Sequence, residues 1–148
     1  MRKSIAAFLC TLCLLGCLPE FSPLVSGTVC DGGVFLGGKT LVREDKPFKS
    51  WSLSQRQLKE LSSWLKLHHS EWSVNIGTSP PPPSYSILLT HSDGAHTQID
   101  LFSINESWQH AIFIYSYDRS GKLLFGGKLR LPNQEIINLK ELLSATEQ

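Results

Sequence analysis

The chain has 148 residues, with 14 Lys and Arg against 13 Asp and Glu, so its net charge is +1 with the histidines neutral. This length allows one domain with a real hydrophobic core and is too short for two comfortable domains. The near-neutral, interspersed charge argues against a nucleic-acid-binding protein, because such a protein carries a basic face.

The first seventeen residues have the layout of an export signal. Residues 2–3 are basic, and residues 5–15 form an unbroken apolar run, which at about eleven residues is too short to span a bilayer. The run closes on Leu14-Leu15-Gly16-Cys17, which resembles the lipobox of bacterial lipoproteins. The resemblance covers residues 1–17 only, and no family is recognised for the remainder of the chain.

The lipobox resemblance implies that the chain is cut after Gly16 and that the thiol of Cys17 receives diacylglycerol, with palmitate among the acyl chains. An Asp after the cysteine favours the inner membrane in such lipoproteins, whereas Leu18 stands there in this chain. The resemblance therefore implies a periplasmic domain anchored in the outer membrane. An ordinary secretory signal, cut after Gly27, is the alternative.

Removal of residues 1–16 leaves 132 residues, with 12 Lys and Arg against 13 acids. Cys10 and Cys13 leave with the signal and Cys17 would be lipidated, so only Cys30 remains as a thiol. A single cysteine in an oxidising compartment is either buried or paired between molecules, and burial is expected here. If Cys17 keeps its thiol, a bridge to Cys30 is possible.

Residues 17–33 are predicted to form a lipidated tether, because Pro, Ser and Gly interrupt any regular pattern there. The single globular domain is expected over residues 34–148. It begins with short strands at 34–36 and 40–42, which form a hairpin around Gly37-Gly38, and continues with a loop at 44–47.

Residues 33–40 also match the G-x-x-x-x-G-K-T phosphate-loop pattern. A phosphate loop follows a buried strand and opens a helix, but Pro47 arrives seven residues after Thr40. The variable positions hold Val, Phe and Leu instead of small residues. We therefore expect neither a nucleotide nor any other cofactor.

A helix is predicted to begin after Ser54, which forms a capping box with Gln57. Apolar side chains then recur at three- and four-residue spacing and predict one buried stripe. The members of the stripe are Leu58, Leu61, Trp64, Leu65 and His68.

The remainder of the chain predicts antiparallel strands followed by a second helix. Strands are expected at 72–76, 85–91, 96–102, 108–117 and 122–131, and the second helix opens at Pro132-Asn133. Asp93-Gly94 is typical of a two-residue type I′ hairpin turn. The predicted fold is α+β: an antiparallel meander with an N-terminal and a C-terminal helix packed on one face.

The histidines raise the question of a metal site. A two-residue turn at Asp93-Gly94 would place His91 and His96 directly opposite each other, on one face of the hairpin. A third ligand, Asp100, would lie about 13 Å further along that face. We therefore expect no metal, and His91 and His96 remain the only candidate ligands.

No catalytic residue is assigned, because the chain has no Gly-x-Ser-x-Gly elbow and Cys30 has no catalytic sequence around it. The four prolines at 80–83 form a stiff, extended loop. Such a loop is either a rigid connector or a ridge that loses little entropy on entering a partner's cleft. The candidate partner-binding residues are therefore Pro80, Pro81, Pro82, Pro83 and Tyr85.

The expected function is binding of a periplasmic protein, most simply as an inhibitor or immunity protein of a periplasmic enzyme or toxin. A structural accessory lipoprotein of a secretion or conjugation complex is the alternative. A periplasmic hydrolase or metal-binding protein is the third reading, and it predicts a pocket where His91, His96 and an acid converge. An enzyme is not expected, nor is a nucleic-acid partner.

Overall fold

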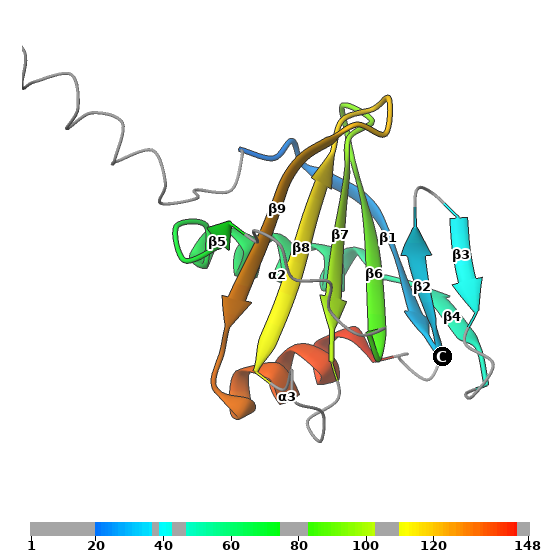
Figure 1. Ribbon diagram of the computed structural model, residues 1–148, viewed down its shortest axis with the longest axis vertical. Coiled ribbons are helices and arrows are strands. Elements are labelled where there is room, and N and C mark those ends of the chain that lie inside the picture. Colours follow the sequence, from blue (N-terminus) through cyan, green and yellow to red (C-terminus); the bar gives the residue numbers. More distant parts are fainter. Residues whose placement is uncertain (1–19, 37–38, 43–46, 75–82, 103–109, 145–148) are drawn as a thin grey trace, which may run out of the picture.

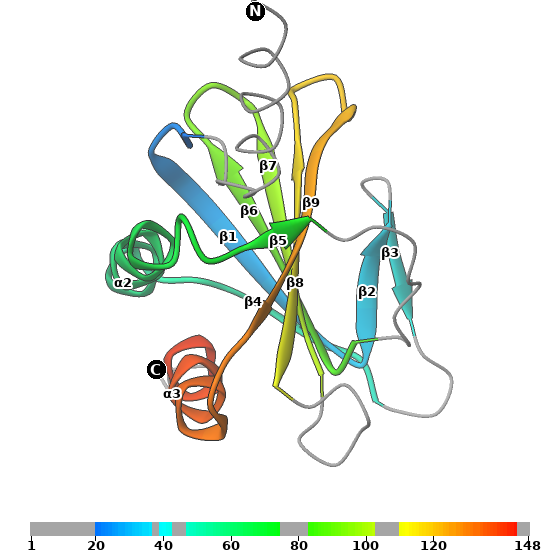
Figure 2. The same ribbon diagram turned by 60° about the vertical axis from the view of Figure 1, so that its left-hand side comes forward.

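The computed structural model describes residues 20–36, 39–42, 47–74, 83–102 and 110–144. Its centre is a seven-stranded antiparallel sheet with the order β4-β1-β6-β7-β8-β9-β5. Both helices lie on one face of this sheet, and the separate β2–β3 ribbon stands on the other side (Figures 1 and 2). The predicted α+β class, with its antiparallel sheet and two helices, is confirmed.

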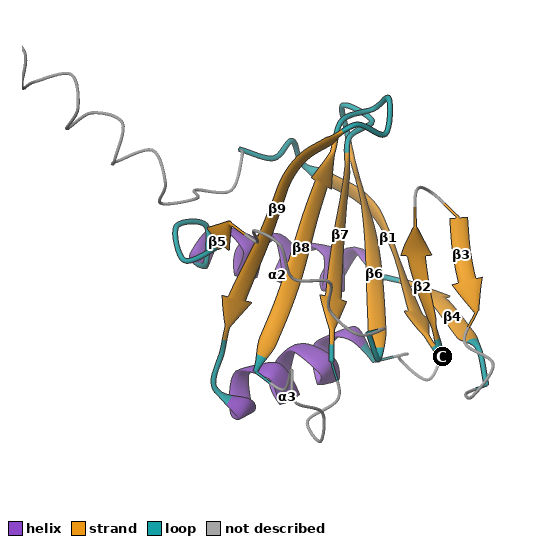
Figure 3. Cartoon of the chain, viewed as in Figure 1, coloured by secondary structure: helices purple, strands orange, loops and turns teal. Residues whose placement is uncertain are grey.

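The secondary structure follows the chain in a simple order, and Figure 3 colours the helices and strands separately. The strands are β1 Leu24–Asp31, β2 Gly33–Leu36, β3 Lys39–Val42, β4 Lys49–Ser52, β5 Ser73–Val74, β6 Tyr85–His91, β7 His96–Leu101, β8 Ala111–Tyr117 and β9 Leu123–Arg130. The helices are α2 Gln55–Leu67 and α3 Asn133–Leu143. Neither of these described helices has the length and apolar character needed to cross a membrane.

The core fills the space between the sheet and the two helices. Alternate residues of each central strand point toward the helices, as the two-residue period of a strand requires. The fully buried strand residues on this face include Val29, Ile87, Leu89, Ile99, Leu101, Ile112 and Ile114. They meet the stripe of α2, in which Leu58, Leu61 and Leu65 are buried as predicted.

The prediction of a tether over residues 17–33 is wrong for its second half. Strand β1 lies inside the sheet, paired with both β4 and β6. Gly27, which looked like a breaker, is required there: a Cβ at this position would come within 2.8 Å of Leu53 and 2.9 Å of Leu89. Close packing against these side chains, not chain flexibility, explains the glycine.

The predicted capping box of α2 is present. The Ser54 hydroxyl accepts from the Gln57 backbone N–H at 3.3 Å, and the Gln57 side chain accepts from the Ser54 backbone N–H at 2.8 Å. The Gln57 amide also donates to the Leu142 carbonyl at 2.8 Å, and Trp51 Nε1 donates to the Leu143 carbonyl at 2.8 Å. One residue of β4 and one of the first turn of α2 thereby satisfy carbonyls at the end of α3.

The predicted two-residue turn between β6 and β7 is wrong. Thr90 pairs with His96, and the His91 N–H donates to the Ala95 carbonyl. Gly94 has φ +83°, so the loop is a three-residue connection that ends in a glycine bulge. The extra residue shifts the register by one, which sends His91 and His96 to opposite faces of the sheet.

Candidate functional site

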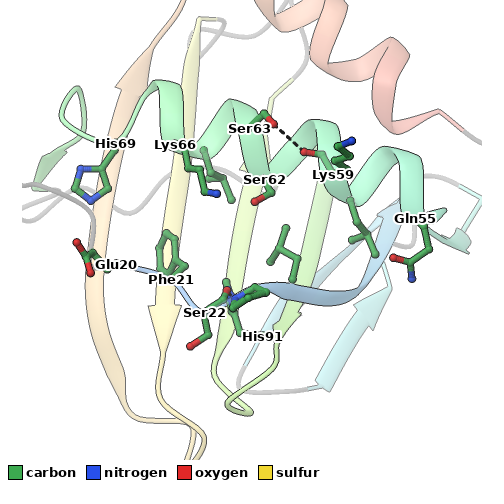
Figure 4. Close-up of a pocket in the computed structure, with 14 residues that line it drawn as sticks. Glu20, Phe21, Ser22, Gln55, Lys59, Ser62, Ser63, Lys66, His69 and His91 are labelled. Atoms are coloured by element: carbon green, nitrogen blue, oxygen red, sulfur yellow. Dashed lines mark hydrogen bonds between the residues drawn. The ribbon is translucent and has the colours of Figure 1, made fainter.

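A pocket of about 800 Å³ lies between α2 and the segment of residues 20–24 (Figure 4). We call it the α2 groove. Its polar lining consists of Glu20, Ser22, Gln55, Lys59, Ser62, Ser63, Lys66, His69 and His91, and its apolar lining of Phe21, Pro23, Leu24, Leu58 and Leu65.

One wall of the α2 groove is held in place by His91, which is buried on the helix face of β6. The ring of His91 stacks on Phe21, with 5.1 Å between the ring centroids. Its Nδ1 lies 2.7 Å from the Ser22 carbonyl and its Nε2 lies 2.8 Å from the Thr97 hydroxyl. Because a carbonyl oxygen only accepts, Nδ1 carries the hydrogen and donates it to Ser22.

Two further hydrogen bonds fix the same segment to the β6–β7 turn. The Ser22 hydroxyl donates to the Asp93 carboxylate at 2.8 Å, and the Ser92 backbone N–H donates to the Pro23 carbonyl at 2.9 Å. The Ala95 backbone N–H, followed by the Ser22 hydroxyl, lowers the pKa of Asp93. The chain is therefore tied to the fold at the two residues that precede β1.

The other wall of the α2 groove is the polar face of the helix. Gln55, Lys59, Ser62 and Lys66 follow one another at spacings of three and four residues, which places them along one side of α2. Figure 4 shows Lys66 reaching toward the segment of residues 20–22. His69, just beyond the helix, has a buried Nε2 with no hydrogen-bond partner among the described residues.

A second polar group lies on the opposite face of the sheet, where β6, β7 and β8 run side by side. We call it the Asp100 cluster: Asp100, Ser86 and Gln98. The Ser86 hydroxyl donates to Asp100 at 2.7 Å, and the Gln98 amide lies 3.1 Å from each carboxylate oxygen. Burial raises the pKa of Asp100 to about 6, although these hydrogen bonds oppose the rise.

Cys30 lies opposite Ser86 in the sheet register, and the expectation that it is buried is confirmed. Burial raises the pKa of this thiol, and a thiol kept protonated in this way is a poor nucleophile. Burial, followed by the nearby charge of Asp100, also raises the pKa of Tyr115 to about 12. The surroundings of the Asp100 cluster thus disfavour charge.

The predicted placement of His91 and His96 on one face is wrong, and with it the pocket in which they would converge with an acid. His91 belongs to the α2 groove, whereas His96 lies on the face of Asp100, about 13 Å along β7. No described histidine contacts Ser86 to activate its hydroxyl. Among the described residues, no three His, Cys, Asp or Glu side chains are grouped so that they could hold a metal ion.

The proposed proline ridge is only partly visible. Pro80, Pro81 and Pro82 lie outside the described residues, as does the predicted lipidation site Cys17. Pro83 is buried and Tyr85 is half-buried, with Lys140 Nζ 5.6 Å from the Tyr85 ring centroid. Pro83 therefore packs into the body of the domain and is not part of an exposed ridge, whereas partner binding by Tyr85 stays a prediction.

The β2–β3 ribbon is the feature that projects from the domain (Figure 2). It is seated by Phe35, which is buried and whose N–H lies 3.5 Å from the Ser86 hydroxyl. Leu41 on the outer strand β3 is 50% exposed, and Phe48, which follows the ribbon, is 40% exposed. Since β3 is a strand, the stretch that matches a phosphate loop does not open a helix.

Sequence reasoning missed the α2 groove, although the polar spacing along α2 was visible in the sequence. Its other wall was assigned to a tether and so was not considered as part of a site. No family model, no curated protein and no solved structure matches this chain.

Proposed function

We propose that the chain is a periplasmic lipoprotein, held in the outer membrane through acylated Cys17, that acts by binding another protein. The finer proposal is an inhibitor or immunity protein that blocks a periplasmic enzyme or toxin. A structural accessory of a secretion or conjugation complex is the competing form of the same proposal.

The projecting β2–β3 ribbon is the observation that supports protein binding. Its outer strand β3 has no strand partner on its outward edge among the described residues, and such an edge is a template for pairing with another chain. Leu41 and Phe48 supply exposed apolar surface at the same place. Phe48 and the Leu41 carbonyl both approach Gly33, coming within 2.9 and 3.0 Å of where its Cβ would stand.

A ribbon of two paired strands has already lost most of its backbone freedom, so little entropy is lost when it enters a cleft. The proline loop was expected to bind a partner for the same reason, and the ribbon has the stiffness that was expected of that loop. The ribbon also lies on the face of the sheet opposite the helices (Figures 1 and 2), whereas residues 20–24 lie beside α2 (Figure 4). A partner could therefore reach it without meeting the membrane anchor.

The experiment is site-specific photocrosslinking in cells that express the full chain. A photoreactive residue replaces Leu41 in one variant and Phe48 in another, and Leu67 serves as the matched control. Leu67 is also an apolar residue and is 73% exposed, but it lies at the end of α2. We expect adducts from positions 41 and 48 and none of the same mass from position 67.

The mass of the adduct separates the forms of the proposal. A single enzyme crosslinked to the chain in a one-to-one ratio supports the inhibitor or immunity protein. Adducts with several proteins of one envelope complex support the structural accessory. Adducts that are absent, or identical from all three positions, would contradict protein binding by the ribbon. Intact mass of the purified protein tests the anchor separately, because diacylglycerol on Cys17 adds a defined mass.

A further inference from the structure

The distance between the lipid anchor and the α2 groove is limited by the length of the chain. Glu20 lines the groove, and three peptide units separate it from Cys17. Three units span at most about 11 Å. If Cys17 carries the acyl chains, the surface of the bilayer lies beside the groove, because the segment after Glu20 is bonded to the β6–β7 turn.

The chemistry of the α2 groove suits an anion. Lys59 and Lys66 bring positive charge, and Ser62 brings a hydroxyl. Phosphate oxygens accept hydrogen bonds from ammonium and hydroxyl groups, and those from charged donors are the stronger ones.

We infer that the α2 groove binds the phosphate of an anionic phospholipid headgroup in the membrane that holds Cys17. This inference rests on the proposed lipid anchor. A headgroup fits the helix wall better than an acyl chain, because an acyl chain would cover the polar groups of Lys59, Ser62 and Lys66 without giving them hydrogen-bond partners.

The lining also contains one group that opposes an anion. Glu20 lies across the α2 groove from the helix (Figure 4). Its carboxylate weakens phosphate binding while it stands there. Replacing Glu20 with Gln removes that repulsion and should therefore strengthen binding to anionic vesicles alone, whereas apolar surface exposed by misfolding would raise binding to neutral vesicles as well.

The test uses residues 17–148 with Cys17→Ser, since every described strand and helix lies between Leu24 and Leu143. Binding to phosphatidylglycerol vesicles and to phosphatidylcholine vesicles is measured by co-sedimentation at low salt. A lysine near an anionic surface contributes about a fivefold change in affinity. We therefore expect Lys59→Gln with Lys66→Gln to weaken phosphatidylglycerol binding about 25-fold, and Glu20→Gln to strengthen it several-fold.

The matched control is Lys49→Gln with Arg130→Gln. These two exposed residues lie away from the groove, and the pair changes the net charge by the same amount. The control should alter affinity less than twofold. An equal loss in both double variants, no preference for phosphatidylglycerol, or stronger binding to polyglutamate would overturn the inference, the last by assigning the groove to an acidic protein segment.

The experiments distinguish failure of the proposed lipid anchor from failure of the proposed headgroup site. Because the test protein carries Ser at position 17, vesicle binding measures the groove alone. If the natural protein is acylated but the test protein shows no preference for phosphatidylglycerol vesicles, the headgroup site is overturned and the lipid anchor is supported. An unacylated Cys17 with the expected vesicle binding overturns the anchor and supports the groove as a headgroup site.

Discussion

The two polar sites on opposite faces of the sheet contain similar kinds of residue and differ in how their hydrogen-bonding groups are satisfied. In the Asp100 cluster, both carboxylate oxygens accept hydrogen bonds and the three side chains are buried. In the α2 groove, the exposed Lys59 and Lys66 line an open pocket, and their ammonium groups have no ion-pair partner among the described residues. A satisfied network holds structure together, whereas unpaired charged donors beside a pocket are available to a ligand.

The largest effect is expected when the wall of the α2 groove is loosened from the sheet. Leu61 is a residue of α2 that is fully buried in the core between the helices and the sheet. Leu61→Ala should therefore lower the free energy of unfolding by about 4 kcal/mol, because burial is lost and a cavity is left. Urea denaturation measures this loss. Leu67→Ala, at an exposed position of the same helix, should change stability by less than about 0.5 kcal/mol; similar losses in both variants would contradict the packing described here.

Asp100→Asn tests the electrostatics of the buried Asp100 cluster, because it removes the ionisable group. Burial raises the pKa of Asp100 from 3.8 to about 6, so the folded protein binds this proton more tightly than the unfolded chain does. The resulting stability is fully present below about pH 4 and is lost as the pH rises through about 6. A difference of about two pKa units corresponds to about 3 kcal/mol.

Urea denaturation between about pH 4 and 7.5 measures that dependence. The free energy of unfolding of the wild-type protein should fall across this range, and Asp100→Asn should remove most of the fall. Lys59→Gln is the comparison from the other site and should leave the slope unchanged. Equal slopes in the wild type and in Asp100→Asn would show that the carboxyl group is ionised in both states.

His91→Leu tests how the first wall of the α2 groove is held. The change leaves the Ser22 carbonyl without its donor and removes the bond to Thr97, which should cost about 2 kcal/mol. Hydrogen exchange should become faster at the Ser92 amide, which donates to Pro23. Unchanged exchange at Ser92 would mean that the segment is held without His91.

The smallest effect concerns the start of α2. Ser54→Ala removes half of the capping box and should lower the free energy of unfolding by about 1 kcal/mol. Ser63→Ala is the matched control within the helix, where the hydroxyl donates only to the Lys59 carbonyl; it should be close to neutral. Thermal unfolding of both variants measures the difference, and a larger loss from Ser63→Ala would contradict the cap.

The strongly periodic parts of the fold were predictable from the sequence. The stripe of α2 and its capping box agree with the structure, and so do the runs that became β6 to β9. In these segments the spacing of apolar residues alone indicates which face is buried, so no information about distant contacts is needed.

Elements that depend on distant contacts were missed. Strand β1 contains Ser26 and Gly27, and only the nearness of Leu53 and Leu89 explains the glycine. Strand β4 is four residues long and has no apolar alternation. The α2 groove was missed for the same reason, because one of its walls is the segment that leads into β1.

The most direct test of how the protein sits on its membrane compares two nitroxide spin labels on the lipidated protein in bilayers. One label replaces Ser63 beside the α2 groove, and the other replaces Lys49, which pairs with Asp31 at the far end of β1. Eight residues of strand separate the two ends of β1 by about 23 Å. Nickel chelated to the lipid headgroups should relax the label at position 63 far more than the label at 49; equal relaxation, or the reverse order, would contradict a groove that faces the bilayer.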